Sequence, residues 1–157
     1  MDTSPFLRLE NAMKLISSLL SGRSLLTLTA QATAFEAAQA MERAHVGCVL
    51  ILDDQDAPLG IFTERDLMTR VVVTGADPKK VRLAKVMTKE LFTASPDEPV
   101  NTVARAMQAR HIRHLPVVED GALRGILSLR DVLRAHLDAK RQEVQDLTAY
   151  IQGEADQ

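Results

Sequence analysis

The chain has 157 residues, of which 46% are hydrophobic and 25% are charged, and its formal net charge is -2. This length and this apolar content allow a real core in one compact domain or in two small interlocked ones. The 19 basic and 21 acidic residues nearly balance, so the chain has no field that would attract nucleic acid or an anionic membrane. Both classes of partner are therefore disfavoured.

The cysteine content and the apolar runs favour a cytoplasmic protein. Cys48 is the single cysteine, so no internal disulfide is possible, and its place in the apolar run 46–52 predicts a buried, inert thiol. No apolar stretch approaches the roughly 18 residues of a membrane span. The first residues lack the basic flank and the cleavage site of a signal peptide, so we expect no membrane association.

The chain begins with a predicted amphipathic helix over residues 1–23. Its apolar residues follow the alternating spacing of three and four that marks one helical face: Phe6, Leu9, Met13, Ile16 and Leu20. This segment lies outside the repeated part of the chain.

A first unit is predicted over residues 24–74. Thr33 and Glu36 have the spacing of a capping box and open a helix that ends near Ala44. The run 47–52 predicts a buried strand, a turn follows, and residues 59–62 predict a second strand before Thr63 starts another helix. Residues 75–88 contain Gly, Pro and Lys and are expected to be a linker.

A second unit is predicted over residues 89–138, with the same order of elements. Residues 95–97 lead into a helix whose apolar positions are Val100, Val103, Ala104 and Met107. Residues 115–118 and 123–127 predict the two strands of a hairpin around a turn at 119–121. Residues 139–157 extend the last helix beyond this unit.

The two units also repeat each other in sequence. The segment 60–67, GIFTERDL, recurs as the segment 125–132, GILSLRDV, at an offset of 65, and the helix and strand before it recur at an offset of 66. Two copies of a small unit that cannot bury its apolar face alone usually pack on each other. The sequence therefore predicts a pseudo-twofold pair with clefts between the copies.

Each copy places a hydroxyl and a carboxylate where a strand turns into a helix. Thr63 and Ser128 stand at the helix start, where backbone N–H groups and the helix dipole favour phosphate. Asp66 and Asp131 follow three residues later, and a carboxylate there can accept both hydroxyls of a ribose. The same spacing is also that of a capping box without any ligand, and one residue can serve both purposes.

Several neighbours could complete such a site. Arg65 and Arg130 precede each aspartate and could neutralise phosphate, although an arginine in a first helical turn is more often solvated. Flat apolar walls that could hold an adenine are offered by Val49 and Ile51 in one copy and by Leu115, Pro116 and Val117 in the other.

These motifs, the tripeptide Val86-Met87-Thr88 and the segment 113–118, RHLPVV, resemble a pair of cystathionine-β-synthase (CBS) domains over about residues 24 to 138. The resemblance implies an α+β fold of tandem β-α-β-β-α repeats whose sheets pack together, with extra helices at both ends. It also implies sensing of an adenosyl ligand, such as AMP, ADP, ATP or S-adenosylmethionine, in clefts that Thr27 and Thr93 also line.

The second cleft is expected to bind more tightly. It has Arg113, His114 and Pro116 where the first copy has Gly47, Cys48 and Leu50, so it is more basic. The predicted ligand-binding residues are Thr93, Arg113, His114, Leu115, Pro116, Ser128, Arg130 and Asp131 in the second copy, and Thr27, Cys48, Val49, Thr63, Arg65 and Asp66 in the first.

Neither a metal site nor a catalytic arrangement is predicted. His111 and His114 have no carboxylate placed to complete a metal site, and Ser128 has no recognisable base. We therefore expect no enzyme but a regulatory module, a homodimer that passes a ligand-dependent change in packing to a regulated protein partner. The alternative is a ligand-independent module for dimerisation or protein interaction.

The two terminal helices leave a further choice open. The last helix carries a heptad-like seam at Leu133, Leu137, Lys140, Val144, Leu147 and Ile151. This seam and that of the first helix can pack on each other, on the core or on a second subunit.

Overall fold

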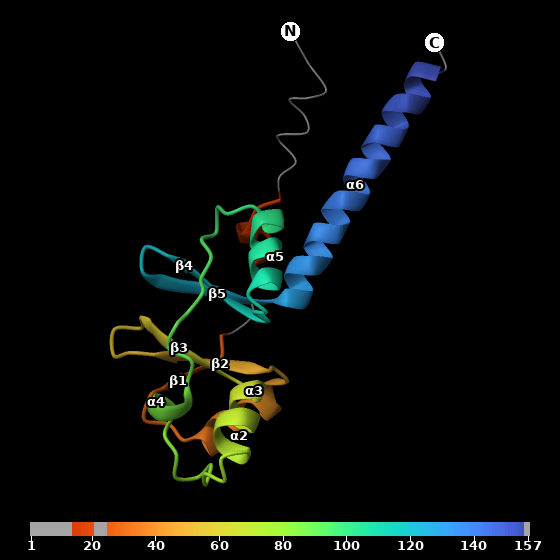
Figure 1. Cartoon of the computed structure of the whole chain (residues 1–157). Coiled ribbons are helices and arrows are strands. Elements are labelled where there is room, and N and C mark those ends of the chain that lie inside the picture. The colour runs from red at the N-terminus through yellow and green to blue at the C-terminus, as the bar shows by residue number, and fades with distance from the viewer. Residues whose placement is uncertain (1–13, 21–24, 156–157) are drawn as a thin grey trace. The chain divides into compact units, whose positions relative to one another are not determined.

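The computed structural model describes residues 14–20 and 25–155 of the chain. It confirms the predicted mixture of helices and strands (Figure 1). In chain order the elements are η1 (Ile16–Leu19), β1 (Thr27–Thr29), α2 (Ala34–Ala44), β2 (Cys48–Leu52), β3 (Pro58–Thr63), α3 (Glu64–Asp66), η2 (Leu67–Val72), α4 (Leu83–Val86), α5 (Val100–Ala109), β4 (His114–Glu119), β5 (Ala122–Ser128) and α6 (Leu129–Ala155).

The described residues divide into two compact units. The strand-rich unit contains residues 25–93 and 116–126, and the helix-rich unit contains residues 14–20, 94–115 and 127–155. These two units do not coincide with the two sequence repeats. The tip of the second hairpin belongs to the unit that contains the first repeat. The predicted domain boundaries at 24–74, 75–88 and 89–138 stay predictions.

A three-stranded sheet is the centre of the strand-rich unit. β2 lies between its neighbours, parallel to β1 and antiparallel to β3. Residues 48–51 of β2 are all buried, which is expected of a continuous apolar run whose two faces are both covered. On one face, Cys48, Leu50 and Ile61 pack with Leu123 and Ile126 of β5.

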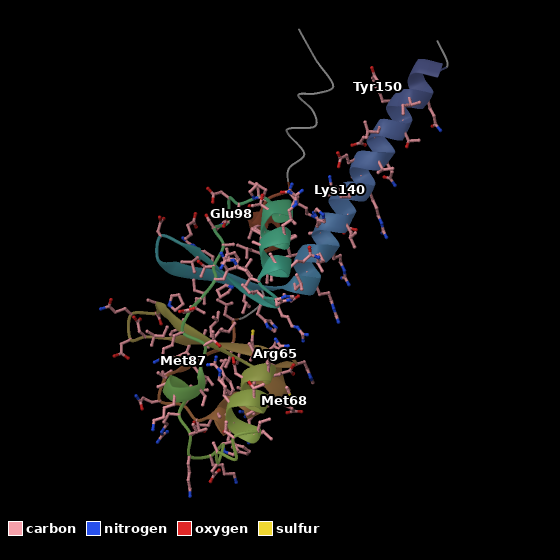
Figure 2. The ribbon with its side chains drawn as sticks, viewed as in Figure 1. Arg65, Met68, Met87, Glu98, Lys140 and Tyr150 are labelled. Atoms are coloured by element: carbon pink, nitrogen blue, oxygen red, sulfur yellow. The ribbon has the colours of Figure 1, made fainter. Side chains whose placement is uncertain are left out.

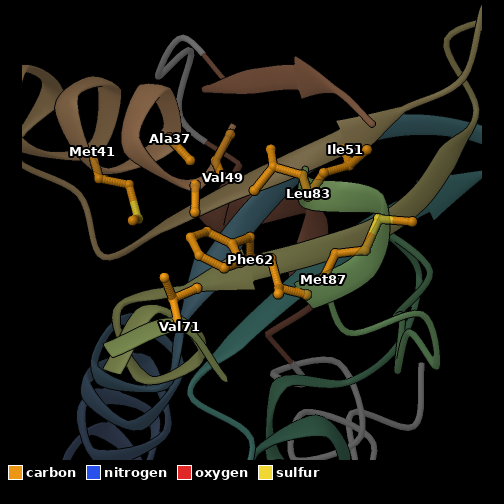
Figure 3. Close-up of a cluster of buried hydrophobic side chains, with 10 residues drawn as sticks. Ala37, Met41, Val49, Ile51, Phe62, Val71, Leu83 and Met87 are labelled. Carbon is orange, nitrogen blue, oxygen red and sulfur yellow. The ribbon is translucent and has the colours of Figure 1, made fainter. Parts of the chain in front are cut away.

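The other face of this sheet carries the larger core (Figure 3). Val49, Ile51 and Phe62 project from the strands, and Phe62 is completely buried. Helices α2, η2 and α4 cover them with the apolar side chains Ala34, Ala37, Met41, Val71, Leu83 and Val86, and Met87 follows α4. Each helix contributes one apolar side to this core. Packing between these helices and the sheet therefore fixes the positions of the ends of β2 and β3.

The start of α2 confirms the predicted capping box. The Thr33 backbone N–H donates to Glu36 Oε2 at 2.7 Å, and the Glu36 N–H donates to Thr33 Oγ1 at 3.2 Å. These bonds to Thr33, together with the charge of Arg82, lower the pKa of the Glu36 carboxyl. The helix ends at Ala44 as predicted, and His45 has a left-handed backbone with φ 54°.

The linker after the first copy pairs with the sheet. Ile61 and Thr88 exchange two backbone hydrogen bonds, of 2.9 and 2.8 Å, so Thr88 lies beside β3. Gly60 faces this crossing, and a Cβ atom built on it would lie 2.8 Å from both Met87 Sδ and the Thr88 carbonyl oxygen. Glycine is required here because the linker approaches the strand so closely.

In the helix-rich unit, α5 packs against the first turns of α6. The predicted apolar stripe of α5 is confirmed, because Val100, Val103, Ala104 and Met107 are all buried. From α6, Val132 and Ala135 are buried. Ile16 of η1 is buried as well, and its N–H donates to the Glu98 carbonyl at 2.9 Å. Most of the predicted N-terminal helix lies outside the described residues.

The helix α6 runs for 27 residues and continues well beyond α5 (Figure 1). Residues 139–155, in the predicted extension of the last helix, continue α6 without interruption. No helix in the described residues is long and apolar enough to cross a membrane.

The duplication is visible in the backbone itself. His45 and His111, 66 residues apart, both have φ 54°; His45 directly follows α2, and His111 lies two residues after the end of α5. In each copy the next residue donates its N–H to a methionine carbonyl of that helix, Val46 to Met41 at 3.1 Å and Ile112 to Met107 at 2.9 Å. The sequence repeat thus predicts a repeat of backbone geometry.

Candidate functional site

Thr63 and Asp66 close the junction between β3 and α3. The Thr63 backbone N–H donates to Asp66 Oδ2 at 3.0 Å, and the Asp66 N–H donates to Thr63 Oγ1 at 3.2 Å. The Glu64 N–H donates to the Gly47 carbonyl at 3.0 Å, so the chain entering β2 lies beside this junction. The geometry is that of a capping box.

The second oxygen of Asp66 is engaged as well. Thr88 Oγ1 donates to Asp66 Oδ1 at 3.3 Å, and Arg70 Nε lies 3.5 Å from the same oxygen. Arg70 also donates to the backbone carbonyls of Val86 and Met87 at 3.3 and 3.0 Å. Asp66 is only 7% exposed, and this network ties the helix to the end of the linker.

The junction at β5 and α6 repeats the first part of this arrangement. The Ser128 N–H donates to Asp131 Oδ2 at 3.2 Å, and the Asp131 N–H donates to Ser128 Oγ at 3.1 Å. The Leu129 N–H donates to the Arg113 carbonyl at 2.7 Å, as Glu64 does to Gly47 in the first copy. Arg113 therefore lies beside the start of α6, and all four residues belong to the helix-rich unit.

The environment of the two aspartates differs. Asp131 is partly exposed, whereas Asp66 is buried. One helical turn after Asp131 the chain has Ala135 at the position that corresponds to Arg70. The second copy thus has no arginine at the position equivalent to Arg70.

The helices that follow the two junctions also differ. α3 has three residues before the chain becomes a π-helix, η2, whereas α6 is a long regular helix. A longer run of aligned peptide groups gives the start of α6 the stronger positive dipole end. The backbone N–H groups of Ser128, Leu129 and Asp131 already donate within the unit. Positive charge at this junction therefore comes mainly from side chains.

The remaining predicted residues of the second copy lie in both units. Arg113 and Arg130 are exposed, and His114 is partly exposed at the start of β4. Leu115 and Pro116 are buried in the same strand. Thr93 is exposed and belongs, with Pro116, to the strand-rich unit.

The remaining predicted residues of the first copy all lie in the strand-rich unit. Thr27 pairs with Leu50 in the sheet, and Arg65 is exposed on α3 (Figure 2). Val49 is completely buried, and Cys48 is 6% exposed. Burial, with a smaller contribution from the charge of Glu64, raises the pKa of the Cys48 thiol to about 12, which confirms the predicted buried cysteine.

Arg70 and the polar role of Thr88 were not predicted from the sequence. Arg70 lies four residues after Asp66, the spacing of neighbours on one helical face, and that spacing is a usable signal. Thr88 was part of the recognised tripeptide, but its bond to Asp66 depends on how the linker folds back. In the described residues no group of three or more His, Cys, Asp or Glu residues could hold a metal ion.

Comparison with known proteins defines the class. The family model "CBS domain" matches residues 11–73 and 83–138, which is most of the chain. The chain belongs to the CBS-domain family, and its two matches confirm the predicted pair of repeats.

One similar protein is "CBS domain-containing protein CBSX3, mitochondrial" from Arabidopsis thaliana. It is 36% identical over 134 residues, which cover 83% of this chain and 65% of the relative. This chain therefore spans slightly less than two thirds of that relative's length.

Two solved structures of similar fold contain ligands. The CBS domain pair of protein MJ0100, in complex with 5′-methylthioadenosine and S-adenosyl-L-methionine, is 27% identical with a TM-score of 0.71, over 79% of this chain and 96% of that one. The CBS domain protein PAE2072 from Pyrobaculum aerophilum, complexed with AMP, is 29% identical with a TM-score of 0.69, over 75% of this chain and 89% of that one.

Proposed function

We propose that this chain is a regulatory module that binds an adenosyl ligand, such as AMP, ADP, ATP or S-adenosylmethionine, at the start of α6. The observation that carries the proposal is the junction of Ser128 and Asp131 beside Arg113. The ligands in the solved structures of MJ0100 and PAE2072 support an adenosyl group as the common chemistry.

The roles of the side chains follow from charge and exposure. Asp131, partly exposed in the first turn of α6, accepts the ribose hydroxyls. Arg113 and Arg130 are exposed and offer two guanidinium groups to a phosphate or to another anionic group of the ligand. His114 and Leu115, in the same unit as Asp131, are the proposed surroundings of the base. Thr93 and Pro116 belong to the other unit and stay predictions.

The first copy is proposed as the weaker site. To bind a ribose, Asp66 would have to release Thr88 and Arg70, and both contacts stabilise the fold. Thr27, Cys48, Val49, Thr63 and Arg65 remain its candidate residues. Burial of Cys48 and Val49 means that the base would reach them only after a rearrangement.

Thermal unfolding with and without AMP, ATP or S-adenosylmethionine tests the proposal. A ligand that binds the native state at a hundred times its Kd stabilises it by about 2.7 kcal/mol. We expect the stabilisation to vanish in Asp131→Asn and to persist in Asp66→Asn, measured against each variant's own unfolding temperature. Equal loss in both variants, or no effect of any ligand on the wild type, contradicts the proposal.

We further propose that the module is a homodimer that pairs through helices of the strand-rich unit. Met68, Val72 and Val73 in and after η2 are 54%, 64% and 74% exposed, which is unusual for three large apolar side chains so close in sequence. A shallow hollow of about 390 Å³ lies nearby between α2 and α3. A Met68→Glu and Val72→Glu double variant is expected to sediment as a monomer.

The second candidate function is a ligand-independent interaction module. The capping role of Asp66 and the exposed apolar side chains of η2 favour it, since neither needs a nucleotide. The thermal unfolding series separates the two candidates. We propose that the chain has no catalytic role. Turnover of ATP by the pure protein would contradict this proposal.

A cytoplasmic location and a regulated protein partner remain proposals that rest on composition and on the family. The plant relative is named as mitochondrial. Fractionation of cells that express the tagged chain measures the location directly.

A further inference from the structure

The carboxylate of Asp66 is fully engaged by the chain itself. Its Oδ2 accepts hydrogen bonds from the Thr63 N–H at 3.0 Å and from Thr63 Oγ1 at 3.2 Å. Its Oδ1 accepts from Thr88 Oγ1 at 3.3 Å and lies 3.5 Å from Arg70 Nε. An ionised carboxylate offers about four acceptor positions on its two oxygens. These contacts therefore fill Asp66, which is only 7% exposed.

A ribose bound to Asp66 would need two of these positions, because its two neighbouring hydroxyl groups both donate to one carboxylate. The contacts at Oδ2 belong to the capping box, in which the Asp66 N–H in turn donates to Thr63 Oγ1 at 3.2 Å. Loss of these contacts would leave backbone N–H groups at the start of α3 without acceptors. Room for a ribose therefore has to be made at Oδ1.

Of the two groups at Oδ1, Thr88 is able to remain beside a bound ribose. Its backbone exchanges hydrogen bonds of 2.9 and 2.8 Å with Ile61, and these bonds hold the linker in place. A threonine hydroxyl rotates and is both a donor and an acceptor, so it can turn from Asp66 and accept a hydrogen bond from the sugar. Thr88 therefore does not exclude the ligand.

Arg70 is the group that competes with the ribose. A guanidinium only donates hydrogen bonds, so it takes up the acceptor positions of Asp66 Oδ1 that the sugar hydroxyls need. Its positive charge makes it a stronger partner of a carboxylate than a neutral hydroxyl is. The same side chain donates through Nη1 to the carbonyls of Val86 and Met87 at 3.3 and 3.0 Å, which holds it beside Oδ1.

The contact between Arg70 and Asp66 is reversible. The side chain of Arg70 is 46% exposed, so it can exchange its partners for water. Ion pairs that water reaches contribute little stability, because solvation of the separated charges offsets their attraction. Loss of the Arg70 side chain should also leave the capping box of Thr63 and Asp66 intact, since that box does not include Arg70.

We infer that Arg70 decides whether the first copy binds an adenosyl ligand. It acts through Asp66, by occupying the oxygen that a ribose requires. A site that is open for only part of the time binds with an affinity reduced by the open fraction. The second copy has Ala135 at the corresponding position, and alanine has no side-chain donor. The inference rests on the proposed function, because it takes an aspartate at these junctions as the ribose acceptor.

Ligand binding by a chain whose second site is disabled tests the inference. In the full chain with Asp131→Asn, isothermal titration calorimetry with AMP and with S-adenosylmethionine measures the first site alone. We expect the added substitution Arg70→Ala to tighten binding about tenfold, to one equivalent of ligand per chain. Asp66→Asn as a third substitution should abolish this binding.

Two further variants, in the same Asp131→Asn chain, control for charge and for folding. Arg43 is exposed on α2, where its Nε donates to the Gln39 carbonyl at 3.3 Å. Arg43→Ala removes the same charge from the strand-rich unit and should leave binding unchanged. Arg70→Gln keeps an uncharged donor for the linker carbonyls and should open the site as Arg70→Ala does. Circular dichroism checks the folding of each variant, and Arg70→Gln replaces Arg70→Ala if the alanine variant does not fold.

The outcomes separate this inference from the proposed function. If neither folded Arg70 variant binds more tightly than Asp131→Asn, the inference is overturned, whereas the proposed function stands when the wild type binds one equivalent. An equal gain in Arg43→Ala, or a gain that survives Asp66→Asn, also overturns the inference, because the binding then has another cause. A wild type that binds neither ligand overturns the proposed function. In that case binding by Arg70→Ala alone supports the inference, and its absence overturns it.

Discussion

Thr88 Oγ1 donates a hydrogen bond of 3.3 Å to Asp66 Oδ1, across a sequence separation of 22 residues. A residue at the end of the linker thereby holds a carboxylate at the start of α3. Asp131 has the same place in the second copy, but the position equivalent to Arg70 is occupied by Ala135 there. The same motif thus has a mainly structural role in the first copy and is more exposed in the second.

The first prediction concerns the stability of the two aspartate variants without ligand. Asp66→Ala leaves the partly buried Thr63 and Thr88 without their acceptor and should lower the free energy of unfolding by about 2 to 4 kcal/mol. Asp131→Ala removes a helix cap at a partly exposed site and should cost about 1 kcal/mol. Urea unfolding followed by circular dichroism measures both.

Thr88→Val is the matched control for the contact to the linker. It retains the size of the side chain and removes one hydrogen bond to Asp66, so a loss of about 1 kcal/mol is expected. Equal stabilities of Asp66→Ala and Asp131→Ala would show that the linker network does not stabilise the fold.

The second prediction concerns the close approach at Gly60. In Gly60→Ala the added methyl group would lie 2.8 Å from Met87 Sδ and from the Thr88 carbonyl oxygen, so the linker must shift. Overpacking of this kind costs about 1 to 3 kcal/mol in the free energy of unfolding.

Gly153→Ala is its control, because nothing lies within 4 Å of the Cβ position there and alanine favours helix. We expect no loss of stability in this variant. Differential scanning calorimetry compares the two, and an unchanged unfolding temperature for Gly60→Ala would contradict the crowded crossing of β3 and the linker.

The third prediction concerns the thiol of Cys48. Because burial raises its pKa to about 12, the native protein should react with iodoacetamide at pH 8.5 far more slowly than the unfolded protein. Mass spectrometry of the alkylated chain gives both rates. Rapid native alkylation at low denaturant would show that β2 opens readily.

The same pKa shift predicts a loss of stability at alkaline pH. The unfolded thiol ionises near its ordinary value of 9.0, whereas the folded thiol stays neutral until about pH 12. Between these values the unfolded state gains up to about 1.4 kcal/mol per pH unit from this group, so stability falls as pH rises. Cys48→Ala should lack this component of the pH dependence, whatever its stability at pH 7.

Local signals in the sequence were sufficient to predict most of the helices and strands. The capping box of Thr33 and Glu36, the buried run of β2 and the apolar stripe of α5 all depend on residues close in sequence, and all three are confirmed. The repeat spacing predicted a hydroxyl and a carboxylate at the start of both helices, and the structure has the same two backbone N–H hydrogen bonds at both junctions.

Long-range contacts were not predictable in this way. The π-helical geometry of η2 and the bond from Thr88 to Asp66 depend on how the linker returns to the sheet.

The sequence by itself determined the duplication, the kinds of element and the residues at each junction, since these depend on apolar periodicity and on hydrogen bonds within one turn. Only the tertiary structure decided that the two aspartates differ. The reason is that burial and hydrogen bonding of a carboxylate depend on residues brought near it by packing, here Thr88 and Arg70 in one copy and Ala135 in the other.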